Sequence, residues 1–146
     1  MRITNKYKQV KEFPTYFEII GEPASKANSR EWMGPRRKLA SGALVGGSQK
    51  SKKAKGYVDL FNLQCPILPE PYEGDVFVII EIFYASRRPD LDESLILDLM
   101  QGKIYKNDRQ VKGRMTKHNL DRENPRCRIY VFEYDNMWDP FKHILP

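Results

Sequence analysis

The pattern of apolar and polar positions along the chain predicts four strands. Residues 15–20 are β-branched or aromatic and end at a Gly-Glu-Pro break. Residues 75–85 are apolar at nearly every position, which is typical of a central strand covered on both faces. Residues 109–117 and 127–134 alternate between apolar and polar side chains. We therefore expect a small sheet built around the segment 75–85.

Two further segments have the spacing of helices. Between residues 48 and 65, apolar side chains recur at helical intervals, and Pro66 follows. A shorter apolar pattern covers residues 93–101, and Gly102 is suited to end that helix. The order of elements is strand, long loop, helix, strand, helix, strand, strand. This order predicts an α+β fold with a small mixed sheet and two main helices, in a single domain spanning residues 1–146.

Two segments show neither the alternation of a strand nor the spacing of a helix. Residues 31–49 contain Pro and Gly breaks and the run Arg36-Arg37-Lys38, so we expect a long, mobile, basic loop, with a plain solvated insertion as the alternative. Residues 136–146 form an aromatic and prolyl tail that either caps the sheet or meets another subunit.

Charge is unevenly distributed. Residues 1–56 carry 13 Lys and Arg against 4 Asp and Glu, whereas residues 57–146 carry 12 against 15. A basic first third beside an acidic cluster favours a polyanionic partner, although a merely solvated basic face is the alternative. Lysines also crowd the start of the first predicted helix, where they oppose the helix dipole and where a phosphate would relieve the repulsion.

The composition also bears on location. No apolar run approaches the roughly 18 residues of a membrane span, and the first residues are polar. The two cysteines, Cys65 and Cys127, are far apart and form no CxxC motif. We therefore expect a cytoplasmic protein with no membrane partner.

Three carboxylates are the candidates for chemistry. Asp90 and Asp92 follow Pro89 in a segment that favours extended backbone, where residues two apart point to the same side. Asp108 lies beyond the short helix. Three neighbouring carboxylates repel one another unless a cation binds, and Mg²⁺ prefers oxygen ligands. The alternatives are that Asp92 only caps the helix and that Asp108 only forms an Asx turn.

Two features surround these candidates. The strand over residues 109–117 is expected to turn Val111 and Met115 inward. Its outward face, with Gln110, Lys112, Arg114 and Thr116, is then expected to be basic and close to Asp108. Asp98 is not expected to be a metal ligand. His118 and His143 lack the spacing of a metal-binding pair, and a structural or surface role is expected for both.

The motif Arg87-Arg88-Pro-Asp90-Leu-Asp92, the apolar helix carrying Asp98, and the segment Tyr105-Lys106-Asn107-Asp108 followed by Gln110-Val111 resemble the RusA family of Holliday junction resolvases. These are bacterial and phage endodeoxyribonucleases. The close match covers residues 87–111, and a weaker likeness extends over residues 15–134.

The resemblance implies a RusA-like homodimer that binds four-way DNA junctions and nicks them symmetrically. It implies Mg²⁺, with Mn²⁺ as an alternative, held by Asp90, Asp92 and Asp108. Arg88 would lie beside the scissile phosphate, and Lys106 is a candidate to supply further positive charge. We expect the DNA-contacting residues to be Lys26, Asn28, Arg30, Lys50, Lys52, Lys53, Arg87, Arg88, Lys112 and Arg114.

The chain also departs from the family pattern. Glu93 stands where the family has asparagine, and the catalytic lysine of the family's helix has no counterpart, its nearest positions being Ser94 and Ile96. Lys106, Lys112, Lys52 and Lys53 are the candidates to replace it. Three alternatives remain open: a junction- or single-strand-binding protein with an impaired site, a metal-dependent nuclease acting on other branched DNA or on RNA, and a protein-interaction module.

Overall fold

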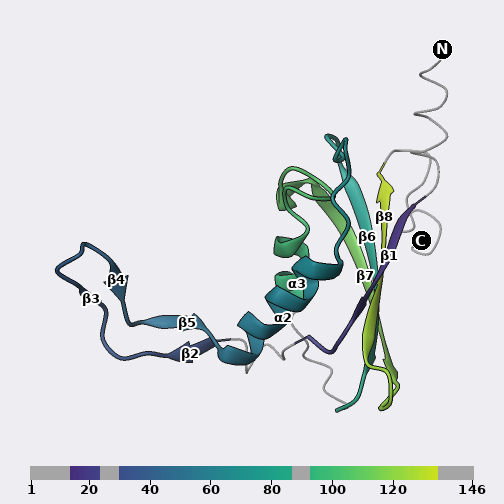
Figure 1. Cartoon of the computed structure of the whole chain (residues 1–146). Helices are drawn as coiled ribbons and strands as arrows, with labels where there is room; N and C mark the ends of the chain where they lie inside the picture. The colour runs from purple at the N-terminus through teal and green to yellow at the C-terminus, as the bar shows by residue number, and fades with distance from the viewer. Residues whose placement is uncertain (1–13, 24–29, 87–92, 135–146) are drawn as a thin grey trace, which may run out of the picture.

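The fold is built on a four-stranded mixed sheet, seen edge-on in Figure 1. The computed structural model describes residues 14–23, 30–86 and 93–134. The strand order is β1 (Thr15–Ile20), β8 (Arg126–Glu133), β6 (Val76–Tyr84) and β7 (Val111–Leu120). β6 and β7 are parallel, and the other neighbours are antiparallel. The predicted α+β class, the mixed sheet and the central place of β6 are confirmed.

The two predicted helices are present, and both lie on one face of this sheet. They are α2 (Lys52–Gln64) and α3 (Glu93–Leu99), and α3 lies in the crossover that joins β6 to β7. Both bury apolar side chains against the side chains of β6 that point to their face, including Val78, Ile80 and Ile82. In the described part of the chain, no helix is long and apolar enough to cross a membrane.

The opposite face of β6 is covered less than we expected. Phe77 is fully buried there, but Ile79, Glu81 and Phe83 are half-buried, and neither α2 nor α3 lies over them. Charged side chains take part of the place of a second layer. The guanidinium carbons of Arg126 and Arg128 lie 3.8 and 5.0 Å from the centre of the Phe83 ring.

The alternation of β7 differs from the prediction. An irregularity pairs Val76 with Val111 but Phe77 with Gly113, after which Val78 pairs with Arg114 and Ile79 with Met115. Met115 therefore lies on the face away from the helices and is exposed, which corrects the expectation that it points inward. The pattern of β7 alone could not show which set of side chains the helices cover.

The segment expected to be a loop over residues 31–49 is instead largely β structure. β2 (Arg30–Trp32) pairs with β5 (Ser48–Lys50), and β3 (Arg37–Lys38) pairs with β4 (Leu44–Val45). These two ladders form a hairpin, called here the arm (residues 30–50), which projects from the body beside the start of α2 (Figure 1). Because residues 48–50 pair with β2, α2 begins only at Lys52. The mobility expected of this segment stays a prediction.

Candidate functional site

A groove runs between α3 and the beginning of β7. Its volume is about 340 Å³, and it is lined by Ser94, Leu97, Asp98, Asp108, Val111, Lys112, Gly113 and Arg114. The groove thus brings Asp108 together with Lys112 and Arg114, as the sequence predicted. A groove lined by two carboxylates, Asp98 and Asp108, and by two cations can bind both a cation and a phosphate.

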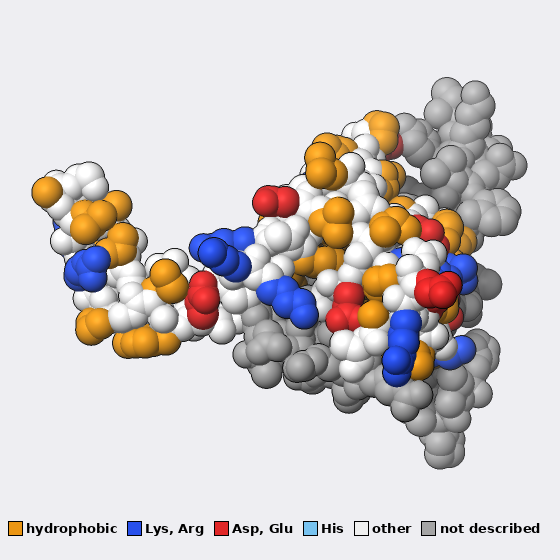
Figure 2. All heavy atoms as spheres, turned by 60° about the horizontal axis from the view of Figure 1, so that its bottom comes forward, with side chains coloured by type: hydrophobic (Ala, Val, Ile, Leu, Met, Phe, Trp, Pro, Cys, Tyr) orange, Lys and Arg blue, Asp and Glu red, His pale blue; other side chains and the backbone are white. Residues whose placement is uncertain are grey.

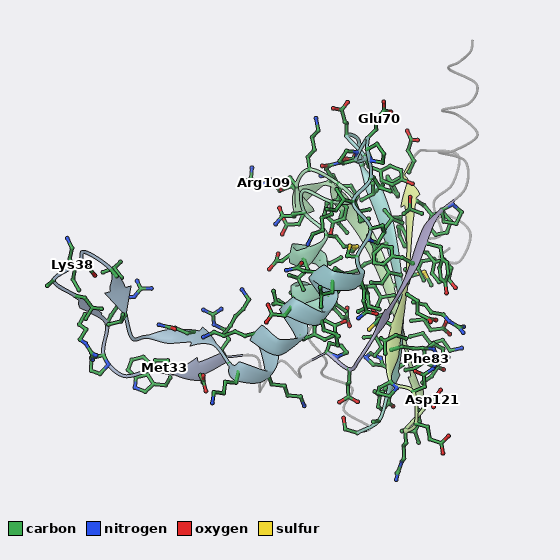
Figure 3. All side chains as sticks on the ribbon, viewed as in Figure 1. Met33, Lys38, Glu70, Phe83, Arg109 and Asp121 are labelled. Atoms are coloured by element: carbon green, nitrogen blue, oxygen red, sulfur yellow. The ribbon has the colours of Figure 1, made fainter. Side chains whose placement is uncertain are left out.

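Asp108 begins the short 3-10 helix η2 (Asp108–Gln110), which precedes β7. The backbone N–H of Asp108 donates to Oε1 of Gln101 at 3.0 Å. Asn107 caps η2, because its Oδ1 accepts from the backbone N–H of Arg109 at 2.9 Å. Figure 3 shows Arg109 pointing away from the body at this turn. The backbone that carries the Asp108 carboxylate is therefore fixed on both sides.

Gln110 anchors the same turn to the rest of the fold. Its Oε1 accepts from the backbone N–H groups of Lys106 and Asn107, both at 2.9 Å. Its Nε2 donates to the carbonyl oxygens of Tyr72 and Gly74, both at 2.7 Å. These four contacts hold the turn to the fold, so Gln110 positions the backbone that carries Asp108.

Tyr105 joins the turn to α3 beneath the groove. Its ring is fully buried, and its hydroxyl donates to the carbonyl oxygen of Leu97 at 2.6 Å. Burial raises the pKa of Tyr105 well above its usual value, and the negative charges of Asp108 and Asp98 raise it further. Both carboxylates are therefore close enough to make the potential at Tyr105 more negative.

The Asp108 carboxylate accepts no hydrogen bond and forms no ion pair within residues 14–23, 30–86 and 93–134. Arg114 extends toward the first residue of α3, where its Nε lies 4.0 Å from Oε2 of Glu93. Free carboxylate oxygens suit a hard cation. Within the same ranges, no three His, Cys, Asp or Glu residues gather to hold a metal ion. The described residues therefore do not by themselves form a metal site, and Asp108 offers one carboxylate to such an ion.

The other predicted residues fall into three places. Lys106 does not line the groove: its ammonium pairs with Glu73 at 2.5 Å, at the surface. Arg30 and Lys50 lie on the arm, and Lys52 and Lys53 lie in the exposed first turn of α2. The remaining predicted residues lie outside the described residues; they are Lys26, Asn28, Arg87, Arg88, Asp90 and Asp92.

Two further polar side chains continue the row that Arg114 begins. Thr116 pairs with Ile80 and His118 with Ile82, so both point to the helix-covered side of β7. Oγ1 of Thr116 and Nε2 of His118 are inaccessible to water and have no hydrogen-bond partner in the described part of the chain. The outward position expected for Thr116 is therefore wrong, because the register of β7 against β6 turns this side chain toward the helices. Tyr84 contacts the His118 ring edge-on, with the ring centres 5.9 Å apart.

No protein-family model matches the chain, and a search of curated proteins finds no similar sequence.

Proposed function

We propose that this protein is a Mg²⁺-dependent, structure-selective endodeoxyribonuclease of the RusA type, which resolves four-way DNA junctions by paired nicks. One observation carries the proposal: the Asp108 carboxylate shares a groove with Lys112 and Arg114, and α3 forms one wall of that groove. α3 begins at Glu93, one residue after Asp92 and three after Asp90. The proposal includes a homodimer and a cytoplasmic location in a bacterial or phage context.

The roles of the groove residues follow from their charges. Asp90, Asp92 and Asp108 would hold the metal ion, with Mn²⁺ able to replace Mg²⁺. A bound divalent ion supplies a polarised phosphoryl oxygen and a water with a lowered pKa. Lys112 and Arg114 would neutralise the phosphate that enters the groove, because both line it.

Lys106 was one candidate to replace the catalytic lysine of the RusA family's helix. Lys106 pairs with Glu73 and does not line the groove. Lys112 and Arg114 do line it, and Arg114 extends toward Glu93. We therefore assign the compensating positive charge to Lys112 and Arg114.

The test is cleavage of a synthetic mobile four-way junction beside a linear duplex of the same sequence, with and without Mg²⁺. We expect paired nicks in the junction alone. Asp92→Asn and Asp108→Asn should abolish cleavage and keep junction binding, because the backbone contact of Asp108 to Gln101 does not use the carboxylate. Asp59→Asn, a change on the exposed side of α2, is the matched control and should cleave normally.

Three other results would contradict the proposal. Binding of the junction without cleavage, under Mg²⁺ or Mn²⁺, would establish the binding protein with an impaired site. Equal cleavage of duplex and junction would establish a nuclease without structural selectivity. Loss of both binding and cleavage in Asp92→Asn would indicate that Asp92 is only a helix cap.

A further inference from the structure

The arm (residues 30–50) is a narrow two-stranded hairpin with a strong positive charge. It holds five cations, and Glu31 is its single anion. Three more cations, Lys52, Lys53 and Lys55, follow in the exposed first turn of α2. The arm projects from the side of the sheet that the helices cover, which is also the side of the groove (Figure 1). One long polyanion can therefore contact both the arm and the groove.

The arm also exposes large apolar side chains among these cations. Trp32 is 70% exposed and Leu44 is 66% exposed, and Met33 and Leu39 are exposed as well. Figure 2 shows hydrophobic and basic side chains mixed along the arm, and Figure 3 shows Met33 and Lys38 at separate points of it. Solubility alone does not explain an exposed indole on this charged strand pair, because an exposed Trp side chain lowers solubility.

The pairing of β2 with β5 explains why the indole is open. Trp32 lies opposite Ser48, whose small side chain cannot cover it. Arg30 holds that serine in place, because its Nε donates to Ser48 Oγ at 3.3 Å and its Nη2 donates to Ser48 O at 3.0 Å. Trp32, Arg30 and Lys50 are thus on one face of the ladder, where the two cations are cross-strand partners and the indole lies two residues further along the strand.

Backbone contacts join the two ladders of the arm. The N–H of Met33 donates to the Gly47 carbonyl at 2.9 Å, and the N–H of Gly47 donates to the Gly34 carbonyl at 2.7 Å. Gly46 has a φ of +85°, and a Cβ there would overlap the Pro35 carbonyl, so only glycine suits this bend. The arm therefore presents Trp32 on a defined backbone.

We propose that the arm is a second nucleic-acid contact, in which its cations bind phosphates and Trp32 stacks on a base that leaves its pair at the branch point of the bound junction. Any base that has left the duplex can stack on an aromatic side chain, whereas all DNA, duplex included, can make the phosphate contacts. The inference rests on the proposed function for the choice of branched DNA as the polyanion. A second copy of the chain is a poorer occupant, because it would bring the same cations against each other.

The experiment measures binding of the full chain to a four-way junction, a single strand and a linear duplex, in buffer with EDTA so that no cleavage occurs. Trp32→Ala should weaken binding to the junction and the single strand by about 5- to 150-fold, the range for loss of one stacked base. Binding to the duplex should stay within about twofold, since it offers no unpaired base. Leu63→Ala removes an equally exposed apolar side chain from α2 and should change none of the three.

A second variant tests the cations. Replacing Arg36, Arg37 and Lys38 together by alanine should weaken binding to all three DNAs and lower the salt slope by about 2 to 3, as expected for three phosphate contacts. In a Trp138→Phe background, Trp32 is the single tryptophan, and its fluorescence should be quenched by the junction and not by the duplex.

Two results would overturn the proposal. One is a Trp32→Ala protein that binds all three DNAs as the unaltered protein does. The other is a Trp32→Ala protein that changes from dimer to monomer in sedimentation, which would make the arm a contact between subunits. Because binding is measured without metal, a protein that never cuts DNA but shows the arm effect refutes only the proposed nuclease. A protein that cuts junctions but lacks the arm effect refutes only the arm.

Discussion

Replacing Gln110 by alanine should loosen the turn that carries Asp108. The change removes two acceptor contacts, from the N–H groups of Lys106 and Asn107, and two donor contacts, to the carbonyls of Tyr72 and Gly74. One intramolecular hydrogen bond contributes about 0.5–1.5 kcal/mol net. The side chain is half-buried, so water can replace part of what is lost. We expect the free energy of unfolding to fall by about 2–4 kcal/mol.

The assay is urea unfolding of the full chain followed by circular dichroism, with the slope m compared between variants. Gln49→Ala is the matched control, because that glutamine makes one contact, from its Nε2 to the Gly46 carbonyl at 3.1 Å. It should cost about 1 kcal/mol or less. If Gln110→Ala unfolds within about 0.5 kcal/mol of the unaltered protein, the turn is not held by Gln110 and its assignment as a positioning residue is wrong.

Three further predictions concern stability. Gly113→Ala should destabilise the fold by about 1–3 kcal/mol, because the added methyl group overlaps the buried Phe77 ring. Thermal unfolding should show a lower melting temperature. An unchanged melting temperature would contradict the register of β7. Ser51→Ala should lower the free energy of unfolding by about 1 kcal/mol, because the hydroxyl oxygen of Ser51 accepts a hydrogen bond from the backbone N–H of Ala54 at 3.1 Å. Urea unfolding measures this loss, and an unchanged free energy would show that Ser51 does not cap α2. A hydrogen bond from Arg126 lowers the pKa of Asp121, so its contribution is present above the ordinary value of 3.8 and is lost as the pH falls through the lower folded value. The urea midpoint of Asp121→Asn should therefore differ from that of the unaltered protein more at about pH 6 than at about pH 2, and an equal difference at both pH values would refute the ion pair.

The sequence predicted those helices and strands in which buried side chains recur at one regular spacing. Residues 15–20 appear as β1 at the predicted bounds, and α2 and β6 appear with small shifts, because long runs of side chains repeat one choice of face. The arm escaped prediction because its strands have two or three residues each. They form through backbone pairing within one hairpin and through a bend at glycine, neither of which leaves a hydrophobic period.

The same distinction holds for the groove. Asp108, Lys112 and Arg114 could be grouped from the sequence, because a turn followed by an alternating strand fixes their relative places. The role of Gln110 could not be predicted, because two of its partners are carbonyls more than 35 positions earlier in the chain. Met115 was placed on the wrong face because the covered side of β7 depends on its register against β6.

The pairing of β1 with β8 has a consequence for synthesis of the protein on the ribosome. Glu18 and Arg128 are partners in this ladder although they are 110 positions apart. In the described part of the chain, β8 is the only neighbour of β1. Among the described strands, β1 is made first and has no strand partner until β8 is made, after all the others. We expect assembly of the nascent chain to start from β6, α3 and β7, with β8 and then β1 completing the sheet.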